Sequence, residues 1–158
     1  MTAQELWQAY IRENPACKEA AYDAWSYGSD IPEELTRLTL AGIKTATASL
    51  YQLYEYEKSE VPKEGTYSVL LDTEGNALCI LMNTAVTIVP FCKVTERQAY
   101  REGEGDRSLS YWRQVHRSFF TQELSEIGMA FSEDMLVVCE EFEIVYRASK
   151  HPGNDSNG

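Results

Sequence analysis

Residues 66–91 read TYSVLLDTEGNALCILMNTAVTIVPF and contain the clearest strand signals of the chain. Two runs of strand-forming residues, 66–71 and 77–82, flank the turn sequence DTEGN, and this pattern predicts a β-hairpin. A further strand is expected at residues 85–91. The middle of the chain is therefore predicted to form a mostly antiparallel sheet.

Two more strands and two helices are expected around this region. The strands are predicted at residues 45–50 and 136–146, and the helices at residues 96–101 and 109–126. Five or more mostly antiparallel strands with a few helices predict an α+β fold. We expect this fold to be a small mixed β-barrel with flanking helices.

The first forty residues are predicted to be helical. Apolar residues recur at helical spacing before Pro15, which ends the first helix. A second short helix is expected at residues 16–25. A third helix begins near Pro32, with Asp30 as its candidate cap, and Gly42 ends it in a left-handed turn.

Length and composition limit the number of domains. The chain has 158 residues, which is enough for one domain with a full core and too short for two comfortable ones. We expect a single domain at residues 1–147, of which residues 1–24 form a helical extension. The polar end, residues 148–158, is expected to be a disordered tail.

The charge balance restricts the class of partner. The chain contains 25 acidic and 14 basic residues, which gives a formal charge of −11. This charge argues against binding of long nucleic acid by bulk electrostatics, but not against a nucleoside or short RNA in a local pocket. The N-terminus has no signal-peptide pattern, and no apolar stretch approaches the roughly 20 residues that span a bilayer. We therefore expect a cytoplasmic protein without a membrane partner.

The four cysteines, Cys17, Cys79, Cys92 and Cys139, are not arranged as metal ligands. A zinc site usually presents close ligand pairs such as CxxC, and this chain has none. We interpret the cysteines as buried thiols of a reducing compartment. No metal and no cofactor are expected, and the oligomeric state is left open.

Residues 41–47, AGIKTAT, lead from the third helix into a strand. Gly42 permits a sharp turn at this point. In an ideal strand Lys44 and Thr47 would point to opposite faces, so they converge only if Lys44 lies in the turn and Thr47 in the strand. The alternative is a solvated loop lysine followed by ordinary strand threonines.

Residues 102–120, EGEGDRSLSYWRQVHRSFF, begin with acidic residues that alternate with glycine. A calcium-binding loop needs glycine at its sixth position and glutamate at its twelfth, and here these positions are Arg107 and Arg113. A calcium site is therefore excluded. The glycines are better explained as positions where the backbone comes close to a ligand.

The second half of this segment predicts a helix capped by Ser108. Trp112 and Phe119 lie on its apolar face, where core packing is the alternative to ligand contact. His116 is interpreted as a hydrogen-bonded structural histidine in preference to a catalytic base.

These elements together resemble the ASCH domain family. The resemblance covers residues 25–147 and rests on GIKTAT, on VTERQAYREGEGDRSLSYWRQVHRSFF and on the closing strand CEEFEIVYR. It implies a PUA-like β-barrel with a pocket, and a link to RNA or to modified nucleosides. A nucleoside or a short RNA is therefore the expected partner.

One branch of this superfamily hydrolyses the amide of 4-acetylcytidine, and its catalytic pattern is similar here. The resemblance implies catalytic roles for Lys44, Thr47 and Glu102. Thr47 would attack the acetyl carbonyl, Lys44 would act as base only if it is neutral, and Glu102 would position the leaving amine or a water. Replacing Lys44 or Thr47 by alanine is then expected to abolish turnover and to leave the melting temperature nearly unchanged.

Further residues are expected to contact the ligand without taking part in chemistry. They are Gly42, Thr45, Asp106, Arg107, Ser108, Trp112, Arg113 and His116.

Two other functions remain open. One is a binding module in which Lys44, Arg107 or Arg113 contacts phosphate and a ring of Trp112 or of the tyrosine-rich stretch at 51–56 stacks on a base. The other is a ribonuclease in which Lys44 stabilises charge at the phosphate and Ser108 takes part. Binding driven by phosphate should weaken steeply with salt, whereas binding of a neutral nucleoside should not.

Overall fold

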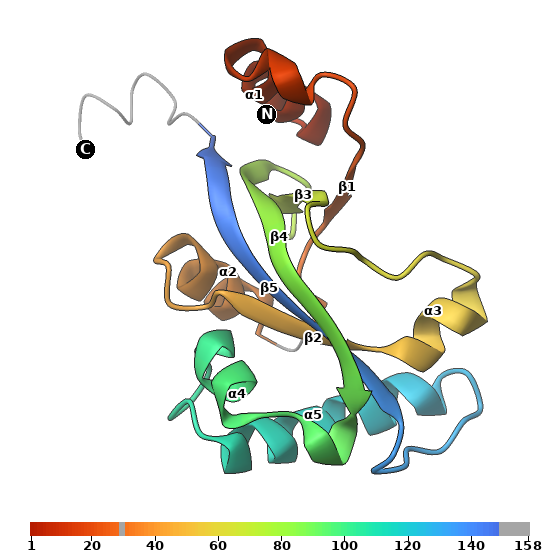
Figure 1. Ribbon diagram of the computed structural model, residues 1–158. Helices are drawn as coiled ribbons and strands as arrows, with labels where there is room; N and C mark the ends of the chain where they lie inside the picture. The colour runs from red at the N-terminus through yellow and green to blue at the C-terminus, as the bar shows by residue number, and fades with distance from the viewer. Residues whose placement is uncertain (29–30, 149–158) are drawn as a thin grey trace.

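A five-stranded sheet forms the centre of the computed structural model, which describes residues 1–28 and 31–148 (Figure 1). The strands are β1 (Tyr22–Trp25), β2 (Ala46–Leu50), β3 (Tyr67–Leu71), β4 (Ala77–Pro90) and β5 (Leu136–Arg147). Their order across the sheet is β1-β3-β4-β5-β2. β1 runs parallel to β3, and the other neighbouring pairs are antiparallel. The predicted α+β class is confirmed.

The β3–β4 hairpin forms where the sequence predicts it. The Asp72 carboxylate closes the turn by accepting hydrogen bonds from the backbone N–H groups of Glu74 and Asn76, both at 2.9 Å. β4 is one strand of 14 residues with a register irregularity between Asn83 and Ala85. The prediction of two separate strands here is wrong, because β5 is long enough to pair with β4 across this irregularity.

The sheet is open within the described residues, so the expected closed barrel is not confirmed. Closure would require the edge strands β1 and β2 to pair with each other. Instead β1 pairs with β3 and β2 pairs with β5. β1 has only four residues and β2 has five, which leaves little backbone for a further ladder.

In the described part of the chain, one helix lies at one end of the sheet and two at the other, and two more flank the two ends of β2 (Figure 1). They are α1 (Ala3–Glu13), α2 (Pro32–Leu40), α3 (Tyr51–Glu57), α4 (Glu96–Glu102) and α5 (Leu109–Ser125), with 3₁₀ turns η1 (Pro15–Cys17) and η2 (Phe91–Lys93). The first, third and last two of the predicted helices are confirmed as α1, α2, α4 and α5. In the described ranges, no helix combines the length and the apolar character that a bilayer crossing requires.

The helix predicted at residues 16–25 is wrong, because this segment contains η1 and then β1. Tyr22 lies opposite Tyr67 of β3, and its ring stacks on Trp7 of α1 with centroids 4.8 Å apart. Pairing with β3 therefore decides the conformation of this segment over its local helical pattern.

Two sequence-based expectations fall outside the described residues. They are the capping role of Asp30 and the disorder of the tail beyond residue 148. The N-cap position of α2 is occupied by Ile31.

Apolar side chains pack at both ends of the sheet. Leu6 and Trp7 of α1 pack with Val69 and Ile80 of the hairpin. At the other end, the aromatic residues of η2 and α5 pack with β2 and β5. The α1 helix therefore shares a hydrophobic cluster with the sheet.

The cysteines only partly match the expectation of buried thiols. All four are free, and Cys79 and Cys139 are buried in the sheet. Cys17, in η1, is half-buried, and Cys92, in η2, is exposed.

Candidate functional site

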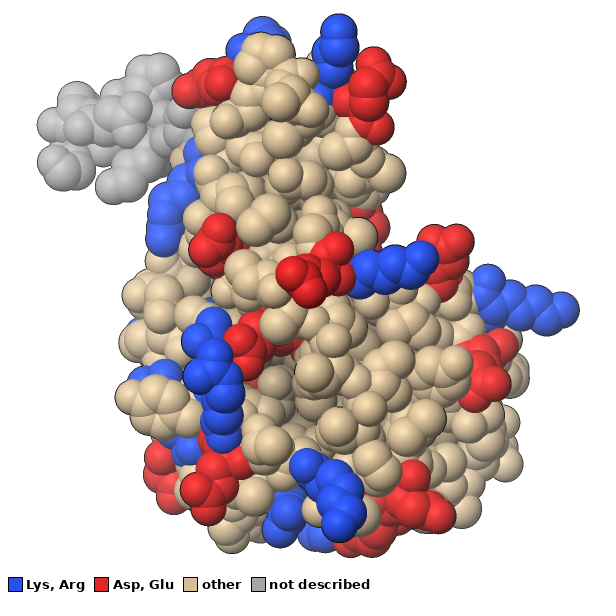
Figure 2. All heavy atoms as spheres, in the orientation of Figure 1, with Lys and Arg blue, Asp and Glu red and all other residues tan. Residues whose placement is uncertain are grey.

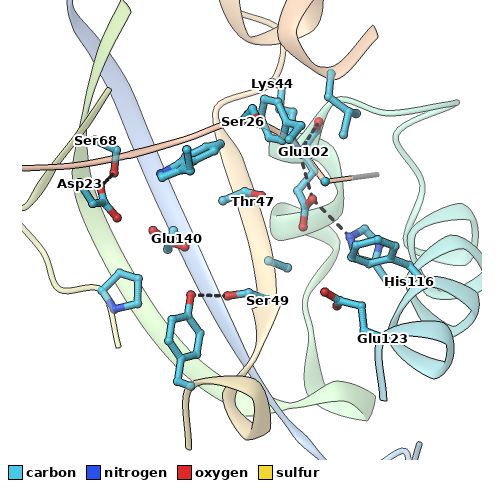
Figure 3. Close-up of a pocket in the computed structure, with 18 of the residues that line it drawn as sticks. Asp23, Ser26, Lys44, Thr47, Ser49, Ser68, Glu102, His116, Glu123 and Glu140 are labelled. Carbon is cyan, nitrogen blue, oxygen red and sulfur yellow. Dashed lines mark hydrogen bonds and ion pairs between the residues drawn. The ribbon is translucent and has the colours of Figure 1, made fainter. Parts of the chain in front are cut away.

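A cleft of about 1550 Å³ opens on the face of the sheet formed by β1, β2, β3 and β5, and α3 and α5 border it (Figure 3). Aromatic rings contribute much of its wall, namely Tyr22, Trp25, Tyr27, Tyr54, Tyr67, Tyr111 and Phe119. Acidic side chains outnumber basic ones in the lining. The acidic residues are Asp23, Glu60, Glu102, Glu104, Glu123, Glu126 and Glu140, and the lysines are Lys44 and Lys63.

Lys44 lies in the turn between α2 and β2, as the sequence predicts. Gly42 adopts a left-handed conformation with φ of +77°, and the N–H of Lys44 donates to the Leu38 carbonyl at 3.0 Å. This turn directs the lysine inward, and its side chain is only 1% exposed. The Nζ atom is 3.1 Å from Glu102 Oε1 and 3.1 Å from Glu104 Oε2.

Glu102, the last residue of α4, is the centre of a buried polar cluster. Besides Lys44, its carboxylate accepts hydrogen bonds from Gln98 Nε2 at 3.0 Å and from Trp112 Nε1 at 2.6 Å. His116 Nε2 lies 3.5 Å from its other oxygen. We call Lys44, Glu102, Glu104, Trp112 and His116 the wall cluster.

Electrostatics keep the wall cluster ionised. Burial favours the neutral forms of Lys44 and Glu102, but their mutual attraction outweighs it and raises the pKa of Lys44 and lowers the pKa of Glu102. Burial disfavours the charged form of His116, but the neighbouring carboxylates, mainly Glu102, favour it more strongly. The pKa of His116 is therefore raised. Lys44 is therefore a charged ammonium and not the neutral base that the expected mechanism needs.

Three members of this cluster also have the donor atoms of a metal site. One ligand atom each from Glu102, Glu104 and His116 lies within 4.8 Å of the others. The Lys44 ammonium contacts both carboxylates and already supplies a positive charge there. The arrangement therefore favours an internal ion cluster over a bound cation.

A second polar group lies at the floor of the cleft, and we call it the floor cluster. Thr47, Glu140, Asp23 and Ser68 line the cleft, and Asn83 belongs to the cluster through its hydrogen bond to Glu140. Thr47 of β2 and Glu140 of β5 are cross-strand partners, so their side chains lie on the same face. Asn83 Nδ2 donates to Glu140 Oε1 at 3.0 Å, and Ser68 Oγ donates to Asp23 at 2.5 Å. In Figure 3, Glu140 lies between Asp23 and Thr47.

Glu140 differs from Glu102 in its protonation. Burial raises the pKa of Glu140 to about 7, with smaller contributions from Asp23 and Glu102, and the hydrogen bond from Asn83 only partly offsets this. Near neutral pH the carboxyl group therefore exchanges between its protonated and ionised forms.

The comparisons with known proteins agree with this fold. Residues 23–146 match the family model of the ASCH domain. The chain belongs to the ASCH domain family. No curated protein matches the sequence significantly.

Two solved structures are similar over nearly the whole chain. The ASCH domain of Lactobacillus crispatus is 32% identical with a TM-score of 0.85, and the match covers 91% of this chain and 94% of that one. A protein of Enterococcus faecalis is also 32% identical with a TM-score of 0.85, and the match covers 98% of this chain and 92% of that one. A hypothetical protein at 18% identity has a TM-score of 0.51, over 78% of this chain and 97% of that one, and supports the fold alone.

Four of the residues predicted for this ASCH site line the cleft. Lys44, Glu102 and His116 lie in its wall, and Thr47 lies on its floor. Lys44 Nζ does not hydrogen-bond the Thr47 hydroxyl, because its partners are Glu102 and Glu104. His116 donates or accepts at the Trp112 carbonyl and faces Glu102, as expected of a structural histidine.

The other predicted ligand contacts of the ASCH motifs do not line the cleft. They are Gly42, Thr45, Asp106, Arg107, Ser108, Trp112 and Arg113. Each has a structural role in the wall instead. Ser108 caps α5 through the N–H of Tyr111, and Asp106 accepts from the N–H of Ser108. Trp112 is buried against Glu102.

The two arginines of this set make contacts with other residues of the protein. Arg107 stacks on Tyr100 with its guanidinium carbon 3.8 Å from the ring centroid, and it donates to the Tyr100 carbonyl at 2.9 Å. Arg113 donates to the Cys92 carbonyl at 3.3 Å, and Thr45 donates to the Arg101 carbonyl. These contacts fasten the 102–108 loop and α5 to the rest of the fold.

Sequence reasoning missed Glu104, Asp23 and Glu140. Glu140 had a usable signal, because it is one of two adjacent glutamates inside the apolar strand LVVCEEFEIVY. Alternation along a strand places one of the two on each face, so one of them has to point into the fold. The tyrosine-rich stretch at 51–56 is helical, and its Tyr54 lines the cleft and hydrogen-bonds Ser49 at 2.8 Å.

Proposed function

We propose that the cleft binds the base of a single nucleoside, or of one unstacked nucleotide in a short RNA. The observation that carries this proposal is a cleft with aromatic walls and a polar floor, which suits a flat heterocycle with hydrogen-bonding edges. ASCH domains are regarded as RNA-binding domains of a PUA-like fold, and this supports the same class of ligand.

The charges of the cleft favour contact with the base over contact with phosphates. Lys44, one of the two lysines that line it, is neutralised by Glu102 and Glu104. On the face drawn in Figure 2, acidic and basic side chains are interspersed and form no continuous basic track. A ribonuclease that grips a run of phosphates would need the opposite balance.

A second candidate is hydrolysis of an acyl group on the amino nitrogen of the bound base, as in 4-acetylcytidine. It is favoured by Thr47, whose hydroxyl has no hydrogen-bond partner among the described residues and borders the cleft. In this version Thr47 attacks the acyl carbon, its proton passes to a cleft carboxylate, and the C–N bond breaks with protonation of the leaving amine. A water molecule then cleaves the acyl-threonine ester, which releases the carboxylic acid and restores the Thr47 hydroxyl. Lys44, as an ammonium, would polarise the acyl oxygen and would not serve as the base.

The test is a calorimetric titration of the purified protein with nucleosides, carried out at 50 mM and at 200 mM salt. Binding of an uncharged nucleoside with little salt dependence is the expected result. Affinity for short RNA alone, with a steep salt dependence, would overturn the proposal. Incubation with 4-acetylcytidine, read by chromatography with Thr47→Val as control, tests the second candidate. Cytidine release by wild type alone supports it, and no release removes it.

A further inference from the structure

We propose that Glu140 and Asn83 form a recognition subsite on the cleft floor for nucleobases that carry an amino group next to a ring nitrogen. This inference rests on the proposed function and names its ligand class. Cytosine, adenine and guanine have such an edge, whereas uracil and hypoxanthine do not.

The carboxyl group of Glu140 is held in a fixed direction. Asn83 Nδ2 donates to its Oε1 atom at 3.0 Å, and the same amide donates to Thr66 Oγ1 at 3.3 Å. Asn83 is only 6% exposed and lies in β4, in the middle of the sheet. One oxygen of Glu140 is thereby anchored, and no described residue hydrogen-bonds the other oxygen. The Glu140 side chain lines the cleft (Figure 3).

No cation neutralises this carboxyl group within the described residues. The groups that face it are Asp23 from β1, Tyr54 from α3 and Glu102 from α4, and none of them carries a positive charge. A ligand that presents N–H donors is therefore favoured at the floor, and one that presents only carbonyl oxygens is disfavoured. Uracil has carbonyl oxygens on both sides of its single N–H.

The protonation of Glu140 fits the same edge. Burial raises its pKa to about 7, so below that pH the group has one O–H donor next to one acceptor oxygen. The O–H can donate to a ring nitrogen such as that of cytosine, while the anchored oxygen accepts from the amino group. Above pH 7 the proton is lost, and the affinity for cytidine should fall.

A glutamine at this position offers the same pair without titration. Its carbonyl oxygen can keep the Asn83 hydrogen bond, and its NH₂ group then faces the ring nitrogen. Glu140→Gln should therefore bind cytidine with an affinity that does not change between pH 6 and pH 8.5. Glu140→Met has neither donor nor acceptor and should lose the preference for cytidine.

The experiment measures calorimetric affinities for cytidine and uridine, and for adenosine and inosine, at pH 6 and pH 8.5. For wild type at pH 6 we expect a preference of about tenfold for the amino member of each pair, as one well-placed hydrogen bond provides. Glu143→Gln is the matched control, because Glu143 lies three residues further along β5 and is exposed. Thermal melting of each variant checks that it is folded.

The outcomes separate this inference from the proposed function. Equal affinities for cytidine and uridine in wild type, or a preference that survives in a folded Glu140→Met, overturn the subsite and leave the nucleoside cleft in place. Absence of binding for all four nucleosides overturns both. A cytidine preference that is lost in Glu140→Met and insensitive to pH in Glu140→Gln establishes the subsite.

Discussion

The wall cluster contains the buried Glu102 and the floor cluster contains the half-buried Glu140, and the pKa values of these two carboxyl groups are shifted in opposite directions. Glu102 receives hydrogen bonds or ion pairs from Lys44, Gln98, Trp112 and His116, and its pKa is lowered. Within residues 1–28 and 31–148, Glu140 receives one hydrogen bond, from Asn83, and burial raises its pKa to about 7. The number and charge of the partners, and not burial alone, decide the state of each carboxyl group.

This difference gives the wall cluster and the floor cluster different roles. The donor side chains of the wall cluster, Lys44, Trp112 and His116, have acceptors within the protein, so the cluster holds α4, α5 and the turn before β2 together. On the floor, the Thr47 hydroxyl and one oxygen of Glu140 remain available to a ligand. The residues that make the sequence recognisable as an ASCH domain mostly build the wall, while the Thr47 hydroxyl and the second Glu140 oxygen, which have no hydrogen-bond partner among the described residues, lie on β2 and β5.

The largest effect is expected from Lys44→Met, which removes the cation of the wall cluster. Glu102 and Glu104 would then remain buried or half-buried without their positive partner, which costs roughly 3–5 kcal/mol. Urea unfolding should reveal this loss. The expectation made from the sequence, that a Lys44 variant keeps its melting temperature, is replaced because Lys44 is the buried ion-pair partner of two carboxylates.

Lys63→Met is the matched control for this change. Lys63 also lines the cleft, but it is exposed. Its removal should change the free energy of unfolding by no more than about 0.5 kcal/mol. Similar losses in both lysine variants would mean that the wall cluster is no more structural than the surface of the cleft.

A smaller effect is expected from Gly103→Ala, in the loop that follows Glu102. Gly103 has φ of +74°, and an added Cβ would lie 2.8 Å from the Ile43 carbonyl oxygen, a backbone atom of the Lys44 turn. Gly42 has a similar φ of +77° but nothing within 4 Å of such a Cβ. Gly103→Ala and its control Gly42→Ala should each lose about 1–2 kcal/mol of unfolding free energy because alanine disfavours the left-handed backbone. Gly103→Ala should lose about 1–3 kcal/mol more because of the clash with Ile43.

Thermal or urea unfolding of the two glycine variants measures this difference directly. Equal losses would show that the loop moves away from Ile43 at no cost. The tight approach between the two motifs would then be dispensable for the wall.

The sequence predicted the elements whose signals are local. The hairpin follows from the DTEGN turn, α5 from its Ser108 cap and apolar face, and the Lys44 turn from Gly42. Each of these depends on neighbours within a few residues. The strand β1 could not be predicted in this way, because its conformation depends on pairing with β3, more than forty residues later in the chain.

The candidate site shows the same division. Lys44, Thr47 and Glu102 were found because they belong to recognisable motifs, but their partners were not predictable. That Glu102 lies 3.1 Å from Lys44 is decided by packing between α4 and the β2 turn, and this contact reverses the protonation that the expected mechanism needed. The adjacent glutamates at 140 and 141 indicate that one of them points inward, but the cross-strand pairing of Glu140 with Thr47 decides which of the two enters the cleft.

The pH dependence of stability distinguishes the two carboxyl groups. Between pH 4.5 and pH 7 the folded state keeps a proton on Glu140 that the unfolded state has released, so stability falls as the pH rises through this range. Glu140→Gln removes this cost. At pH 8 the variant should melt about 2–4 °C above wild type, as roughly 1 kcal/mol produces in a domain of this size.

At pH 4.5 the melting temperatures of wild type and Glu140→Gln should converge, because Glu140 is then protonated in the folded protein. Burial and the neighbouring Glu126 also raise the pKa of Glu123 to about 7. Part of the fall in stability with rising pH should therefore remain in Glu140→Gln and in Glu143→Gln. Glu143→Gln should not alter the profile. A constant difference between wild type and Glu140→Gln at all pH values would mean that Glu140 is ionised like Glu102.

The smallest effect on stability is expected from Thr47→Val, and it tests the contrast between wall and floor most sharply. Valine has nearly the same shape and suits a strand, and the hydroxyl that it removes has no partner among the described residues. The free energy of unfolding should therefore change by no more than about 0.5 kcal/mol. If the floor is where the ligand reacts, the same variant should lose all hydrolysis of 4-acetylcytidine. A stability loss well above 1 kcal/mol would instead place Thr47 with Lys44, among the residues that hold the cleft together. The floor would then have to act through Glu140 alone.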